Sequence, residues 1–189
     1  MKQLRPRRRE AGATLIEILV SILILMFGLL GLVGVMVQSQ RAQLESFQRE
    51  QALLLAQDMV SRMIVNKAAA NCYVLATYLG VDNLTPPVST TCTGVSTAQA
   101  ARFASDMADW LAQLRGASET VTATGNMAGG IPFARGCITK DAATGIYQVS
   151  VAWQGSATTS APPAGITCGL NAYGTDTARR AVALTALIV

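Results

Sequence analysis

Residues 5–37 read RPRRREAGATLIEILVSILILMFGLLGLVGVMV, and this stretch decides how the rest of the chain is interpreted. Glu17 is followed by twenty uncharged residues, Ile18–Val37. As a helix these would span about 30 Å, the thickness of a bilayer's hydrocarbon core. A carboxylate deep in that core would cost roughly 2.5–3.5 kcal/mol. Glu17 is therefore either an interfacial charge on a single-pass anchor or a group with a cationic partner in the membrane.

A secretory signal peptide is the closest alternative for this segment. Its apolar core would have about 7–15 residues and would end at a small-x-small cleavage site. The apolar run here is longer, and Val35–Ser39 offers no such site. We therefore expect the segment to remain attached to the mature protein.

The basic character of the chain is concentrated in its first twelve residues. They hold Lys2, Arg5, Arg7, Arg8 and Arg9 against Glu10, whereas the remaining residues hold ten basic and ten acidic side chains. The positive-inside rule predicts that such a leader stays in the cytoplasm. Basic residues are scattered beyond the leader, so no nucleic acid contact is indicated.

The basic leader, Gly12 and the sequence Ala13-Thr14-Leu15-Ile16-Glu17 resemble the class III signal of type IV prepilins and type II secretion pseudopilins. The resemblance implies that prepilin peptidase cuts between Gly12 and Ala13 and that Ala13 is then N-methylated. It also implies that Glu17 pairs with the terminal amine of a neighbouring subunit during assembly. The family often begins its mature chain with Phe or Met, and Ala13 points toward a minor member.

Good helix formers continue without Pro or Gly from Gln38 to about Ala70. We expect one helix from Ala13 to near Ala70, about 85 Å long. Gly28, Gly31 and Gly34 in its apolar half could permit close helix packing or local unwinding. An apolar stripe of helical period is expected to face the core of the following domain: Leu44, Phe47, Leu55, Met59 and Met63, with Ile64 alongside.

A second helix is predicted from about Thr97 to Arg115. Ser96 or Thr97 is a plausible N-cap, and Gly116 a plausible C′ residue. Its apolar face holds Phe103, Met107, Trp110, Leu111 and Leu114, and Trp110 is interpreted as a core residue. Asp106 and Asp109 are expected to be solvated.

The remaining predicted elements are strands. Residues 134–140 and 146–154 flank a five-residue hairpin loop ending in Gly145, and a final strand covers Arg180–Val189. Alternation in residues 147–154 predicts one apolar and one mixed face. The expected fold is α+β, a long N-terminal helix packed on a small antiparallel sheet. The expected domains are a cleaved leader (1–12), a transmembrane and assembly half-helix (13–37), and an exported head (38–189).

All four cysteines follow residue 70, on the side of the membrane opposite the leader. An even number in an oxidising compartment predicts two disulfides, with three possible connectivities. Cys72–Cys92 and Cys137–Cys168 are favoured because each closes a loop between neighbouring elements. A metal site is a poor alternative because the chain has no C-x-x-C and no histidine.

The absence of histidine excludes Ser-His-Asp and Cys-His catalysis and His-ligated metals. No P-loop, dinucleotide fingerprint or tight acidic cluster occurs in the sequence. The chain is therefore predicted not to be an enzyme and to need no cofactor.

Later segments resemble the minor pilin family PilV, the type IV pilus modification proteins. They are the helix with its Asp109-Trp110-Leu111 centre, residues 134–139, residues 147–155, Cys168 and the Arg179-Arg180 pair. The resemblance implies a subunit that primes pilus assembly and sits at or near the tip. It implies an inner-membrane, single-pass precursor with a periplasmic head. Its implied partners are prepilin peptidase, the major and other minor pilins and the assembly platform, with a tip adhesin as a further candidate. A type II secretion pseudopilin and a plain membrane-anchored binding module are the alternatives.

Overall fold

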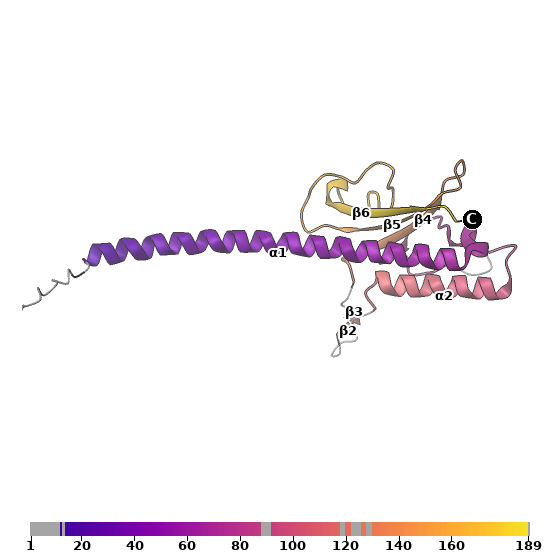
Figure 1. The fold of residues 1–189 in the computed structure, drawn as a ribbon, viewed down its shortest axis with the longest axis horizontal. Helices are drawn as coiled ribbons and strands as arrows, with labels where there is room; N and C mark the ends of the chain where they lie inside the picture. The colour runs from indigo at the N-terminus through magenta and orange to yellow at the C-terminus, as the bar shows by residue number, and fades with distance from the viewer. Residues whose placement is uncertain are drawn as a thin grey trace, which may run out of the picture. The chain divides into compact units, whose positions relative to one another are not determined.

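The computed structural model describes Gly12 and residues 14–87, 92–117, 120–121, 126–127 and 130–188. The chain divides into two compact units, residues 1–43 and 44–189. Helix α1, Leu15–Val65, contributes its first part to one unit and its last part to the other (Figure 1). Residues 1–11 of the expected leader, Ala13 and the expected strand end at Val189 lie outside the described residues.

In the first unit, α1 begins where the Thr14 carbonyl accepts hydrogen bonds from the backbone N–H groups of Glu17 (3.1 Å) and Ile18 (3.3 Å). The helix continues without a break through Gly28, Gly31 and Gly34. All its residues up to Gln43 are exposed.

The second unit holds the end of α1, a second helix and a four-stranded antiparallel sheet of order β1-β4-β5-β6. This confirms the predicted α+β fold. Its further elements are η1 (Lys67–Tyr73), β1 (Leu79–Gly80), α2 (Thr97–Leu114), β4 (Arg135–Lys140), β5 (Tyr147–Gln154), η3 (Asp176–Ala178) and β6 (Arg179–Ala186), with a separate ribbon of β2 (Thr120–Val121) and β3 (Asn126–Met127).

The central hairpin forms as its sequence predicts. Residues of β4 and β5 pair from Arg135↔Ala152 to Lys140↔Tyr147. In the connecting loop, Asp141 Oδ1 accepts the N–H groups of Ala143 (2.8 Å) and Thr144 (3.0 Å), and Gly145 has φ 73°. These backbone bonds, first that of Thr144, hold the pKa of the Asp141 carboxyl below its usual range.

Helix α2 also begins and ends as predicted. Ser96 forms a capping box with Gln99, and Gly116 follows the helix with φ 79°. Trp110 is fully buried and donates from Nε1 to the Leu55 carbonyl (3.0 Å), which confirms that it belongs to the core. A Cβ on Gly136 would come within 2.3 Å of the Trp110 ring, so glycine is needed there in β4.

The face that α1 turns to the core differs from the predicted stripe. Met59 and Met63 are buried as expected, but Leu44, Phe47 and Ile64 are more than half exposed. Ala52 and Ala56 are buried in their place, so the core face follows the spacing 52, 56, 59, 63. The small side chains of these alanines allow α1 to approach its neighbours closely. A prediction based only on large apolar residues does not detect such positions. The cluster joins α1 to α2 and the sheet through Phe103, Met107, Trp110, Ile138, Val149, Val151 and Val182.

The second face of β5 was predicted to be mixed, yet Ser150 and Ala152 are buried. Cys168 and Tyr173, from the long segment between β5 and β6, pack against Ala152 on that face. The sheet is therefore covered on both sides, by helices on one and by a loop on the other.

Candidate functional site at the N-terminal apolar segment

Glu17 lies in the first turn of α1, where the helix dipole favours a negative charge. Its backbone carbonyl accepts a hydrogen bond from Ser21 Oγ (2.7 Å). Its side chain is exposed, and within the described part of the chain the carboxylate has neither an ion-pair nor a hydrogen-bond partner. The structure thus places Glu17 at the start of the apolar segment and leaves its charge uncompensated there.

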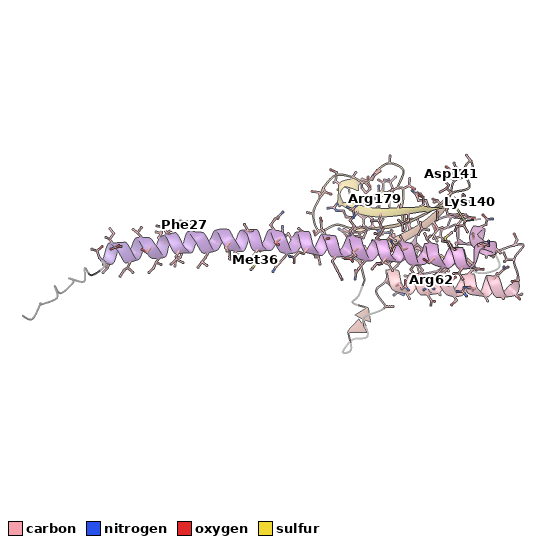
Figure 2. The ribbon with its side chains drawn as sticks, in the orientation of Figure 1. Phe27, Met36, Arg62, Lys140, Asp141 and Arg179 are labelled. Carbon is pink, nitrogen blue, oxygen red and sulfur yellow. A yellow bond between two sulfur atoms is a disulfide. The ribbon has the colours of Figure 1, made fainter. Side chains whose placement is uncertain are left out.

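The apolar segment after Glu17 is exposed along its whole length. The large apolar side chains between Leu15 and Val37 are 43–81% exposed. An 18-residue stretch of α1 has a mean hydropathy of 2.9, and none of it is buried. Among the described residues, α1 is the one helix that is long and apolar enough to cross a membrane. Figure 2 shows the side chains projecting all round this part of α1, with Phe27 and Met36 labelled. A surface this apolar needs lipid or neighbouring helices to cover it.

Two of the three glycines of this segment, Gly28 and Gly31, line a shallow groove. It is lined by Gly28, Gly31, Leu32, Val35 and Met36, and continues to Gln43. A Cβ added at Gly28, Gly31 or Gly34 would meet no atom within 4 Å, so nothing within the chain requires glycine there. Small residues at this spacing let another helix approach closely in a membrane.

The four cysteines form two bridges in the second unit. Cys72 is joined to Cys92 (Cα–Cα 5.1 Å) and Cys137 to Cys168 (Cα–Cα 5.7 Å), the pairing that the sequence favoured. The first bridge ties η1 to the segment before α2. The second ties β4 to the loop that covers the sheet.

A buried polar cluster connects α1, η1 and α2, and the sequence analysis missed it. Asp106 was expected to be solvated but is only 5% exposed, because its carboxylate accepts from Tyr73 Oη (2.6 Å) and Arg62 Nη1 (3.1 Å). Burial, and then the bond to Asp106, raise the pKa of the Tyr73 hydroxyl well above its usual value. Asp109 is exposed as expected and also pairs with Arg62 (3.3 Å), which Figure 2 labels beside α2. The only sequence signal for this cluster was the four-residue spacing of Asp58 and Arg62, which places both side chains on one face of a helix.

Arg135 and Arg179 are both buried and connect loops to the sheet. The Arg135 guanidinium lies 5.0 Å from the Tyr78 ring centroid and 4.6 Å from that of Tyr173, and it pairs with Asp82. Burial opposes its charge, but the contacts with Tyr173 and Asp82 outweigh that effect and raise the pKa of Arg135.

Arg179 donates to the carbonyls of Ile166 (2.7 Å) and Cys168 (2.9 Å). It also pairs with Asp176 (2.5 Å), and this pairing holds the pKa of the Asp176 carboxyl below its usual range. Both arginines hold the covering loop in place.

Over the ranges that the structure describes, no three His, Cys, Asp or Glu side chains are placed to hold a metal ion. The assembled chemistry is therefore that of an apolar, glycine-containing helix with one carboxylate at its start, followed by a disulfide-linked α+β unit.

Residues 7–33 match the family model described as the prokaryotic N-terminal methylation motif. This motif indicates a type IV pilin or pseudopilin, and it implies processing by prepilin peptidase and membrane-associated assembly. The chain has the α+β fold of type IV pilins, with the long N-terminal helix and the small antiparallel sheet. No curated protein and no solved structure matches the chain.

Proposed function

We propose that this chain is a minor pilin of a type IV pilus, of the PilV type, which helps to prime assembly and sits at or near the tip. The observation that carries the proposal is Glu17, an exposed carboxylate without a partner in the described residues, at the start of a membrane-length apolar helix. A structural subunit of this kind is usually not an enzyme. We propose that the chain acts by assembly alone and without a cofactor.

In this proposal the Glu17 carboxylate forms an ion pair with the terminal amine of a neighbouring subunit. Cleavage after Gly12 creates that amine at Ala13, and methylation of Ala13 leaves it positively charged at neutral pH. In a low-dielectric setting such a pair offsets desolvation, whereas removing one partner strands the other at a cost of about 3–5 kcal/mol. The carboxylate is thus costly in a lone anchor and favourable in an assembly.

The proposed life history has two stages. The precursor sits in the inner membrane with its disulfide-bonded head in the periplasm, and prepilin peptidase then removes residues 1–12. The mature subunit joins other minor pilins and the major pilin at the assembly platform, and leaves with the fibre, where a tip adhesin is a further candidate partner. The uncovered apolar helix supports both stages, because lipid covers it first and neighbouring helices cover it later.

Glu17→Ala tests this proposal in the full-length chain. The variant should still insert, since its segment is more apolar, and mass analysis of the membrane fraction should show a chain that begins at methylated Ala13. Its incorporation into sheared surface pili should fall by at least about tenfold, the equivalent of 1.4 kcal/mol. Ser21→Ala, which removes a polar atom one turn further on, is the matched control and should assemble normally.

Normal incorporation of Glu17→Ala would contradict the pairing and leave Glu17 as an interfacial charge. A mature protein that retains residues 1–12 would favour a plain anchored module. A type II secretion pseudopilin shares the same signal, so a deletion strain decides between the two assemblies: loss of twitching supports the pilus, and loss of exoprotein secretion overturns it.

A further inference from the structure

The two edges of the sheet are built differently. β1 closes one edge with only two residues, Leu79–Gly80. β6 forms the other edge with eight residues, and all eight pair with β5 on its inner side. Natural sheets usually blunt a long edge with lysine, proline, a bulge or a covering segment. From Ala181 to Ile188 the sequence AVALTALI contains no charge, no proline and no glycine.

The hydrogen-bond pattern identifies the backbone groups that point outward from β6. The bond from Asp141 N–H to the Ile146 carbonyl makes the even-numbered residues of β5 bond toward β4, since bonding alternates along an antiparallel ladder. The odd-numbered residues of β5 then bond to β6, through partners such as Leu184 and Val182. The N–H and C=O groups of Ala181, Ala183 and Thr185 therefore face away from the sheet.

These outward groups are unused. In the described part of the chain no hydrogen bond reaches the backbone of Ala181, Ala183 or Thr185 from the outer side. Thr185 is exposed and the two alanines are half-buried, so no large side chain shields the edge. An unpaired row of alternating donors and acceptors is complementary to one kind of ligand, an extended peptide backbone.

We propose that the free edge of β6 binds an extended, uncharged segment of a different protein, which adds a fifth strand to the sheet. The bound segment is expected to be uncharged because both arginines that begin β6 already have partners. Arg179 is paired with Asp176 (2.5 Å) and Arg180 with Glu45 (3.1 Å). Among the described residues of this edge, no unpaired cation remains to bind an acidic segment.

A second copy of this chain fits the edge poorly. In the 44–189 unit, α1 and β6 run in the same direction (Figure 1), so antiparallel β6–β6 pairing would place Leu44 of the two copies at opposite ends. The points at which the two apolar segments join their heads would then lie at opposite ends of the dimer, which is unfavourable for two copies anchored in one bilayer; this step rests on the membrane anchoring in the proposed function. Parallel pairing would be slightly less stable per residue than antiparallel pairing.

Site-specific photocrosslinking in cells that produce the full-length chain tests the proposal. A benzoylphenylalanine probe replaces Ala183 in one strain and Leu187, which is 63% exposed, in another. Each should give one conjugate with a different protein, and the two crosslinked residues of that protein should lie about four apart in an uncharged run, because paired strands keep register. Thr185→Pro, which removes an outward N–H but no ladder bond, should lower the yield about tenfold. Thr185→Val, which keeps the N–H, should not.

A conjugate with the mass of two copies, crosslinks without the expected spacing, no conjugate at either position, or equal yields from the proline and valine variants would each overturn the proposal. Both variants must melt like the parent in detergent. If Thr185→Pro melts lower, Thr185→Lys replaces it, because an edge lysine blocks strand pairing and keeps the ladder. Crosslinking is scored in membranes, before assembly. If the chain with Thr185 unchanged gives no conjugate but pili form normally, only the proposal for the β6 edge is refuted. If that chain gives the expected conjugates but Glu17→Ala still enters pili, only the pairing at Glu17 is refuted.

Discussion

The first part of α1 and the 44–189 unit solve the problem of apolar side chains in opposite ways. Between Leu15 and Val37 every large apolar side chain is exposed, and its cover must come from outside the chain. In the 44–189 unit the same helix buries alanines and methionines against α2 and the sheet. One helix therefore has two kinds of interface: the first depends on lipid or other subunits, and the second is satisfied within the chain. Substitutions should affect stability in the second region and assembly in the first.

Removing the Cys137–Cys168 bridge should have the largest effect on stability. Changing both residues to Ser frees a segment with a sequence separation of 31 residues, and a loop of that length costs about 3–4 kcal/mol when its bridge is lost. Thermal melting of the full chain in detergent should show a lower Tm, while carbonate extraction should still find the protein in the membrane. An unchanged Tm would mean that Arg135 and Arg179 hold the covering loop without the bridge.

One substitution made in both regions sharpens the comparison. Met59 is fully buried, and Met59→Ala should destabilise the unit by about 3 kcal/mol through lost packing. Met36 is 56% exposed on the same helix, and Met36→Ala should leave the free energy of unfolding within about 0.5 kcal/mol. Denaturant titration of both full-length variants in detergent measures the difference. Equal destabilisation would show that the apolar segment contributes to the stability of the head.

Tyr73→Phe should have a smaller effect than Met59→Ala, about 2 kcal/mol, because it leaves the buried Asp106 carboxylate with one partner fewer. The loss should also depend on pH. Burial raises the pKa of Tyr73 in the folded state, so its contribution is complete below the unfolded value of about 10 and is lost as pH rises through the folded value. The gap in Tm between parent and variant should therefore be full at pH 8 and narrower at pH 11. If the Tm of parent and variant fell in parallel as pH rises, ionisation of Tyr73 would not contribute to the pH dependence of stability.

The elements that could be predicted were those with strong local signals. The Ser96 cap, the Gly145 loop and the β4–β5 hairpin lie where the sequence placed them. The errors arose where distant segments determine the environment. Ala52 and Ala56 reach the core because close approach matters more there than side-chain size, and Ser150 is buried because the loop containing Cys168 covers it.

The candidate site likewise has features that could be predicted from the sequence and features that could not. Glu17 and its apolar segment stand out in the sequence, because a carboxylate before twenty uncharged residues is unusual. The burial of Asp106 could not be predicted, since it depends on Tyr73 and Arg62 from two other elements. The free edge of β6 could not be predicted either, since an edge exists only once the strand order is known.

The ion pair between Glu45 and Arg180 has a consequence for the order in which the chain folds. It joins residues separated by 135 positions, and the core face of α1 likewise packs against strands that follow it by many residues. While the chain is being synthesised, Ala52, Met59 and their neighbours emerge long before β4, β5 and β6 exist to cover them. Such non-local contacts form slowly. Each new molecule therefore passes through an interval in which both halves of α1 are uncovered, and in that interval it is most exposed to proteases and most in need of a chaperone.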